Sequence, residues 1–183
     1  MPHIHDKPGQ HDLVVGAFIF YRTKQGYQVL LHRHKISKKY SHPGGHVELD
    51  EDPWQAPIKE IREETGYDES QLTLLQPNNR VKELLLSEAK VIPQPLFINT
   101  HKAHGTKDHI HIDMEYVLTA ESKSSIHKVA ESESQDIKFF SLKEVDELVS
   151  ENDCIGFVHD TVSYIVLNIL DSWEQIPAST LSE

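Results

Sequence analysis

The feature that most restricts the fold is the segment at residues 45–67, which reads GHVELDEDPWQAPIKEIREETGY. Asp52 followed by Pro53 predicts the start of a helix, because an acid can cap the first free amide groups and proline suits the first helical position. Gly66 predicts the end, since glycine readily adopts the left-handed conformation that closes many helices. We therefore expect one helix over residues 52–65.

The two faces of this expected helix differ in chemistry. At about 100° per residue, an apolar stripe suited to a core carries Trp54, Ile58, Ile61 and Thr65. The adjoining face carries the carboxylates of Glu60, Glu63 and Glu64. The helix is thus expected to bury one side and to present clustered acids beside it.

The three carboxylates need a compensating positive charge. Like charges at i, i+3 and i+4 destabilise a helix, and the negative end of the helix dipole adds to the repulsion. Oxygen-only clusters suit hard divalent cations such as Mg²⁺ or Mn²⁺, which also bridge to phosphate oxygens. The alternative is a solvated helix face on which Lys59 and Arg62 neutralise the acids.

Together with its neighbours, the segment resembles the Nudix box, G-x5-E-x7-R-E-U-x-E-E-x-G-U, in which U is apolar. Gly45, Glu51 and the run at 59–67, KEIREETGY, fit this pattern with one departure. Lys59 stands where the family has arginine, and Tyr67 takes the last apolar position. The preceding strand pair and the run Pro43-Gly44-Gly45 are also similar to the family, so the resemblance extends over residues 12–150.

The resemblance implies an α/β (α+β) fold, an α/β/α sandwich around a mixed β-sheet, with the box as a loop–helix–loop. It also implies Mg²⁺- or Mn²⁺-dependent hydrolysis of a pyrophosphate bond in a nucleoside diphosphate linked to another group. A small nucleotide or nucleotide derivative is then the expected partner. The alternative is a Nudix-like domain that binds or senses a nucleotide without cleaving it, which the lysine at position 59 favours weakly.

The resemblance also implies roles for individual residues. Glu63 and Glu64 would be metal ligands, and Glu60 would be a further ligand or the base that activates water. The carbonyl of Gly44 would complete the metal shell, and Glu51 would pair with Lys59. The implied catalytic residues are therefore Glu51, Lys59, Glu60 and Glu63.

Two regions outside the box could contribute further groups. Family members often take another metal-ligating acid from a late loop before an aromatic-led strand; Glu133 and Asp136 occupy that position, and we favour Glu133. The strand expected at 109–118 alternates, and its polar face carries His109, His111, Asp113 and Glu115. That face either lines the substrate cleft, touching phosphate or base, or faces solvent, with Asp113 and Glu115 as the better candidates for substrate contact.

The chain contains 13 histidines, and three pairs of them have alternating spacing. His3-x-His5, His32-x-His34 and His109-x-His111 each put two imidazoles on one strand face, as a zinc site would need. No spacing supplies a clear third ligand. The sequence therefore favours surface or cleft histidines over a zinc site.

The rest of the chain predicts a mixed sheet with helices packed on it. Apolar and β-branched runs predict strands at 13–21, 27–32, 72–75, 96–101, 109–118 and 137–140, the first two forming a hairpin around Gly26. Ser141 and Glu144 form a capping-box pattern for a helix to about residue 149, and helical spacing predicts a closing helix at 157–173. Residues 77–95 fit neither class clearly, and the last ten residues are expected to be frayed. Strands and helices alternate without a strict βαβ order, which predicts a mixed sheet.

Size, charge and cysteine content narrow the remaining options. The 183 residues suit a single domain over 1–183, with 151–183 as the closing helix and tail. A net charge of −11 disfavours stable nucleic-acid binding. There is no apolar run long enough for a membrane span and no signal peptide at the start, and the single Cys154 suits a reducing compartment. We therefore expect a cytoplasmic protein without a membrane partner; the sequence leaves a homodimer open.

Overall fold

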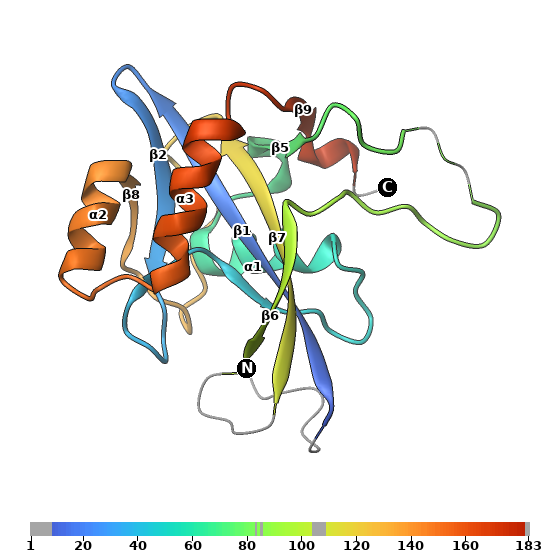
Figure 1. The fold of residues 1–183 in the computed structure, drawn as a ribbon, viewed down its shortest axis with the longest axis horizontal. Helices are drawn as coiled ribbons and strands as arrows, with labels where there is room; N and C mark the ends of the chain where they lie inside the picture. Colours follow the sequence, from blue (N-terminus) through green and yellow to red (C-terminus); the bar gives the residue numbers. More distant parts are fainter. Residues whose placement is uncertain (1–8, 83, 85, 104–108, 182–183) are drawn as a thin grey trace.

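The computed structural model describes residues 9–82, 84, 86–103 and 109–181, and its elements are labelled in Figure 1. The strands are β1 (His11–Thr23), β2 (Gly26–Arg33), β3 (Tyr40–Ser41), β4 (Gly44–His46), β5 (Leu72–Gln76), β6 (Phe97–Lys102), β7 (Ile110–Ala120), β8 (Ile137–Ser141) and β9 (Glu174–Pro177). The helices are α1 (Gln55–Thr65), α2 (Leu142–Ser150) and α3 (Gly156–Asn168), with short 3₁₀ turns η1 (Glu69–Gln71) and η2 (Ala178–Thr180). Among the described residues, no helix combines the length and the apolar character needed to cross a bilayer.

The strands form one mixed sheet in which β1 and β7 lie at the centre. Its main path is β3-β2-β1-β7-β5-β9, with β4 paired to β1, β6 to β7 and β8 to β2. β1 and β7 run parallel, from His11 opposite Ile110 to Phe20 opposite Thr119. The other pairs are antiparallel. The predicted mixed sheet and the predicted hairpin of β1 with β2 are both confirmed.

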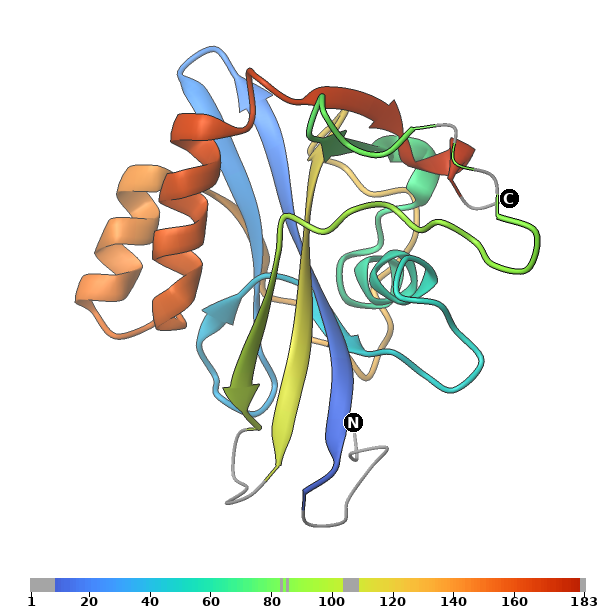
Figure 2. The same cartoon turned by 45° about the vertical axis from the view of Figure 1, so that its right-hand side comes forward.

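Helices cover both faces of this sheet. Figure 2 shows α2 and α3 on one face and α1 on the other. β1 serves both layers, because successive side chains of a strand point to opposite faces. Val15 and Ile19 pack in a core cluster with Ile61 of α1, whereas Phe18 packs in a second cluster with Val162 of α3. The predicted α/β/α sandwich is confirmed, and the apolar stripe of α1 is buried as expected.

Helix α1 ends where the sequence predicts and begins later. Gly66 closes it with a φ of 75°. The carboxylate of Asp52 accepts hydrogen bonds from the N–H groups of Trp54 and Gln55, both at 2.8 Å, so it caps the turn ahead of the helix. The later start puts Pro57 in the first helical turn, where the N–H that proline lacks would have no acceptor within the helix.

The end of the chain differs from its prediction. Helix α3 ends at Asn168 rather than Trp173, and the chain then forms β9, which pairs with β5. Glu174 forms an ion pair with Arg80, and Ala178 is fully buried. The predicted frayed tail is therefore wrong. The short polar sequence of β9 carries no strand signal, because half of its side chains face solvent at the sheet edge.

The remaining predictions are largely correct. Ser141 and Glu144 form the expected capping box at the start of α2, with the Ser141 N–H donating to Glu144 Oε2 at 2.7 Å. Cys154 is a buried free thiol. Between β5 and β6 the described residues form neither helix nor strand, which answers the ambiguity of residues 77–95. The short strands β3 and β4 were not expected in a segment that the sequence predicts as a loop.

Candidate active site

The box glutamates lie under the glycine pair that precedes the helix. Glu60 and Glu64 of α1 are only 6% and 8% exposed. The N–H of Gly44 donates to Glu64 Oε2 at 2.9 Å. A Cβ added at Gly45 would collide with the carboxylate of Glu60, so only glycine lets the backbone of β4 approach this closely.

Burial makes these two carboxylates costly to ionise. Burial, together with the nearby charge of Glu63, raises the pKa of Glu60 to about 7. Burial and the charge of Glu60 raise the pKa of Glu64 to about 8, against the effect of the Gly44 hydrogen bond. Buried charges normally need a partner of opposite sign. An all-oxygen donor set of this kind fits a hard divalent cation, so the residues present suit the metal that the box implies.

A late loop brings a fourth acid to the same place. The loop packs along the end of α1, where the Ala130 N–H donates to the carbonyl of Glu63 at 3.1 Å. Glu133, three residues on, lies close enough to raise the pKa of both Glu60 and Glu64, and it forms an ion pair with Lys35. The loop position favoured from the sequence therefore lies beside the box acids.

Asp136 lies elsewhere. Its carboxylate accepts hydrogen bonds from Arg33 Nε at 3.1 Å and from the Tyr40 hydroxyl at 2.7 Å. Hydrogen bonding to Lys138, then to Tyr40 and Arg33, lowers its pKa to about 2. These contacts join β2, β3 and β8, so the side chain holds strands together rather than joining the box acids.

Lys59, which stands where the family has arginine, forms an ion pair with Glu51. Lys59 Nζ lies 2.6 Å from Glu51 Oε1, and the hydrogen bond to Glu51 raises the pKa of the lysine. Glu51 also accepts from the N–H of Glu48 at 3.3 Å, which ties the loop ahead of α1 to this pair. A lysine therefore makes the contact for which the family uses arginine, with one donor nitrogen instead of a fork.

One neighbour of the box acids was missed from the sequence. His32 Nε2 lies 3.5 Å from Glu64 Oε2, and the side chain is almost fully buried. Burial, aided by the charges of His34 and His42, lowers the pKa of His32 to about 4, so its ring is neutral at pH 7. The sequence grouped His32 with His34 as a possible zinc pair, and no signal connected it to a helix some thirty residues later.

The polar residues of β7 lie on the face opposite α1. Glu115 is fully buried and its carboxylate lies 3.1 Å from His42 Nε2. Burial favours the neutral imidazole, yet the charge of Glu115 raises the pKa of His42 overall. Burial and the charge of Glu115 raise the pKa of Asp113 to about 7. The solvent-facing alternative is therefore wrong for Asp113 and Glu115, and their contact with substrate stays a prediction.

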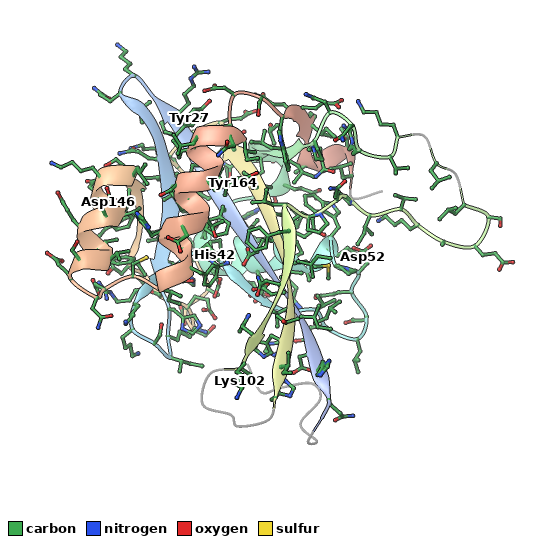
Figure 3. All side chains as sticks on the ribbon, viewed as in Figure 1. Tyr27, His42, Asp52, Lys102, Asp146 and Tyr164 are labelled. Atoms are coloured by element: carbon green, nitrogen blue, oxygen red, sulfur yellow. The ribbon has the colours of Figure 1, made fainter. Side chains whose placement is uncertain are left out.

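His42 and Glu115 fit over β1 because Gly16 has no side chain at this point. A Cβ added at Gly16 of β1 would collide with both His42 and Glu115. His42, labelled in Figure 3, lies beside the start of α3, with its ring 5.4 Å from that of Phe157. No local sequence pattern connects His42 with Glu115, because their contact depends on β1 lying between β4 and β7.

The other two candidates, His109 just ahead of β7 and His111 within it, lie nearer the end of the sheet. His109 Nε2 is 3.1 Å from Asp12 Oδ2, and His46 Nε2 is 3.3 Å from the same oxygen. His111 lies beside them, with its ring 5.2 Å from that of His46. Asp12 and His46 were absent from the sequence prediction, and the pair His3-x-His5 lies outside the described residues.

A separate cavity lies away from these groups. It has a volume of about 590 Å³ and lies between β5, β9 and the segment at 80–94. Apolar residues such as Leu74, Val91 and Ile176 line it beside Arg80 and Lys82, which both pair with Glu174. No box carboxylate lines this cavity.

Comparison with known proteins identifies the fold family. A family model described as the NUDIX domain matches residues 10–155, most of the chain. The chain belongs to the Nudix family. The resemblance drawn from the box is thereby confirmed, together with the fold that it implied.

Among curated proteins, the chain is 30% identical over 118 residues to the "Probable DHNTP pyrophosphohydrolase" of Lactococcus lactis subsp. cremoris (strain MG1363). The matched stretch covers 64% of this Nudix chain and 57% of that relative. The chain therefore matches little more than half the length of the relative.

Solved Nudix structures match over a larger share of their length. A hydrolase of the NUDIX family from Clostridium perfringens is 27% identical, with a TM-score of 0.67, and the match covers 86% of this chain and 97% of that one. A NUDIX hydrolase from Nitrosomonas europaea is 16% identical with a TM-score of 0.59, covering 95% and 97%. A C. elegans Ap4A hydrolase in a binary complex is 19% identical with a TM-score of 0.58, covering 85% and 98%. The last two matches support the fold alone.

Proposed function

We propose that this Nudix protein is a hydrolase that uses Mg²⁺ or Mn²⁺ to cleave a pyrophosphate bond in a nucleoside diphosphate linked to another group. The observation that carries the proposal is the pair of buried box carboxylates, Glu60 and Glu64, packed against the backbone of Gly44 and Gly45. Two buried acids that repel each other suit a bound divalent cation, which is what metal-assisted hydrolysis needs.

The proposed metal ligands are the carboxylates of Glu60, Glu63 and Glu64 and the carbonyl of Gly44, with Glu133 beside them. When bound, the cation supplies positive charge to the diphosphate and lowers the pKa of the attacking water. Glu60 either ligates the ion or takes the proton from that water. The pair of Glu51 with Lys59 holds the loop ahead of α1, and so orients the box.

Positive charge beside the acids suits an anionic substrate. Lys35 forms an ion pair with Glu133 at the edge of the box site, and its side chain is about half exposed. Its ammonium group can therefore also contact a phosphate oxygen of the substrate. Neutral His32 lies next to Glu64 and adds a polar group without adding charge. His109, His111, Asp113 and Glu115 remain the predicted substrate-contacting set.

The names of two relatives agree with this chemistry. The L. lactis relative is named as a pyrophosphohydrolase, and the C. perfringens structure is described as a hydrolase. A nucleotide or nucleotide derivative, the class that the box resemblance implies, is the substrate that we propose. The cytoplasmic location and the homodimer stay predictions from the sequence.

A panel of nucleoside triphosphates, dinucleoside polyphosphates and nucleotide sugars tests the proposal. Each compound is incubated with the full chain, with and without Mg²⁺, and the products are identified by mass. We expect cleavage at a phosphoanhydride bond only when the cation is present, and the product masses reveal which phosphorus is attacked. Tight binding of a nucleotide without any product would instead support the sensor alternative.

A further inference from the structure

We propose that Asp12, His46 and His111 form a second cation site, for Zn²⁺, on the face of the sheet opposite the box helix. Each residue offers one ligand atom, and these atoms all lie within 4.8 Å of one another. The proposal rests on a set of residues separate from the box acids, so it stands independently of the proposed hydrolase activity.

The sheet itself brings the three residues together. Asp12 of β1 is the register partner of His111 of β7, and His46 of β4 is the register partner of Val14, two residues along the same strand. Residues two apart on a strand share a face, so all three side chains point to the same side. The ligands therefore sit on hydrogen-bonded strands, which hold a metal site more rigidly than loops do.

The distances suit a small tetrahedral ion. His46 Nε2 lies 3.3 Å from Asp12 Oδ2. With zinc–ligand bonds of roughly 2.0–2.1 Å, ligand atoms at tetrahedral positions stand about 3.4 Å apart. The carboxylate and the imidazole of His46 are thus already spaced as two ligands of one ion, and His111 needs only a side-chain movement to join them.

The donor set selects the kind of metal. Two imidazoles and one carboxylate suit Zn²⁺, whereas Mg²⁺ prefers oxygen ligands alone. A third imidazole is close, since His109 Nε2 lies 3.1 Å from Asp12 Oδ2. Asp12 is fully buried, His46 is 8% exposed and His111 is half-buried, so two of the three ligands are shielded from competing water. The three grouped side chains leave one tetrahedral position, which His109 or a water would take.

Surrounding contacts orient the ligands as in known zinc sites. His111 Nδ1 lies 3.3 Å from His101 Nε2, and His101 Nδ1 lies 3.2 Å from Asn99 Oδ1. Such outer contacts fix the ring orientation of a ligating histidine. Lys102, labelled in Figure 3, marks the end of β6 at which these residues gather.

The site would have a structural task. An ion held by Asp12, His46 and His111 would join β1, β4 and β7 at one point. His46 directly follows Gly45, whose backbone packs on Glu60. The ion would therefore fix the strand that positions the glycine pair of the box. A zinc-bound His111 would not contact the substrate, so the zinc site is the alternative to the predicted substrate contact of His111.

Metal analysis of the untagged full chain tests the proposal. The protein is stripped with a chelator, dialysed against Zn²⁺ with excess Mg²⁺, and its zinc content is measured by mass spectrometry. We expect one zinc per chain in the wild type. Since changes even to outer contacts cost about 10–100-fold in metal affinity, His111→Gln should lower the zinc affinity by more than about 100-fold, and Asp12→Asn should do the same.

The matched control is His159→Gln. His159 also contacts aspartates, Asp146 at 2.8 Å and Asp160 at 3.1 Å, but it lies on α3 away from the proposed site. This variant and Glu64→Gln should keep the wild-type zinc content. Circular dichroism of the metal-free variants checks that each one is folded.

A measurement on the wild type needs no variant. Co²⁺ in place of Zn²⁺ should give the intense visible bands of a tetrahedral ion with nitrogen ligands. Absence of these bands, a wild type without zinc, or unchanged zinc in both site variants would overturn the proposal. Loss of zinc in Glu64→Gln alone would assign the ion to the box and equally reject the second site.

Discussion

Two clusters of ionisable side chains lie on opposite faces of the same sheet, and they differ in chemistry. Under α1 the groups are carboxylates, with Glu60 and Glu64 buried and Glu63 and Glu133 around them. On the other face the cluster of Asp12, His46 and His111 is rich in imidazole. The backbone is shared, because β4 contributes Gly44 and Gly45 to one cluster and His46 to the other.

The difference shows how one sheet can place a cluster suited to Mg²⁺ on one face and a cluster suited to Zn²⁺ on the other. In the acid cluster burial raises the pKa values of Glu60 and Glu64, so a hard cation is the natural counter-charge. In the histidine cluster His46 Nε2 lies 3.3 Å from Asp12 Oδ2 and His111 lies nearby, so two imidazole nitrogens and one carboxylate favour a nitrogen-binding metal. Changing one cluster should therefore leave the other intact.

The largest expected effect comes from breaking the acid cluster. Glu63→Gln and Glu64→Gln should each lower kcat by at least about 100-fold, since each removes one charged metal ligand while keeping the side-chain shape. Steady-state kinetics at limiting Mg²⁺ measure the loss, and Glu131→Gln, an exposed acid in the loop that carries Glu133, is the control. Wild-type turnover in either variant would remove that glutamate from the site.

The acid cluster should also make stability depend on pH and on Mg²⁺. The folded pKa values of Glu60 and Glu64, about 7 and 8, lie above the ordinary value of 4.5. The folded state then holds more protons than the unfolded state between those values, so without metal the free energy of unfolding falls as pH rises from about 4.5 to 8. Mg²⁺ should reverse this loss, because it stabilises the ionised carboxylates.

Thermal melts with and without Mg²⁺ across this pH range measure the effect. One pKa unit corresponds to about 1.4 kcal/mol, so the stabilisation by Mg²⁺ should reach a few kcal/mol near pH 8 and be small near pH 5. Taking the difference between the two melts removes the contributions of groups away from the metal, such as His42 and Asp113. An equal Mg²⁺ effect at both ends of the range would contradict the assignment.

A smaller effect is expected from the fourth acid. Glu133→Gln should lower Mg²⁺ affinity or kcat by about tenfold, because Glu133 lies at the edge of the cluster and is shared with Lys35. Metal titrations of activity, with Glu131→Gln as control, separate the two quantities. If the Mg²⁺ affinity and kcat are both unchanged, Glu133 only pairs with Lys35 and the box residues alone hold the metal.

The smallest change is expected at Lys59. Lys59→Arg would replace one donor with a forked guanidinium facing Glu51, so the loop ahead of α1 should be held more firmly. We expect a rise in kcat or in Mn²⁺ affinity of less than about tenfold, a barrier change below about 1.4 kcal/mol. Identical Mn²⁺ titration curves for the two proteins would mean that the lysine substitution is neutral.

The two clusters also differ in how far the sequence predicts them. The acid cluster lies on one helix, where spacing alone places Glu60, Glu63 and Glu64 on one face. The histidine cluster depends on three strands, and no local pattern shows that Asp12 and His111 become register partners about a hundred residues apart. For the same reason the sequence could not predict the contact of His42 with Glu115.

Local signals likewise explain which elements were predicted well. The hairpin of β1 with β2 and the capping box of α2 are encoded by neighbouring residues. The start of α1 was predicted three residues too early, because Asp52 caps the turn ahead of the helix rather than the helix itself. β9 is a strand only because β5 offers it a free edge, a tertiary effect that its short polar sequence does not reveal.

The long separation of β1 from β7 also affects how the protein is made. Residues such as His11 and Ile110 pair in parallel although the ribosome synthesises them about a hundred residues apart. At about 5–20 residues per second, the partner strand emerges roughly 5–20 s after β1. During that interval the apolar β1 can pair with β2 and β4, and the edge that later pairs with β7 stays open to association with other chains. Completion of the sheet centre is thus limited by translation speed, and slow synthesis prolongs the period in which the nascent chain is prone to aggregation.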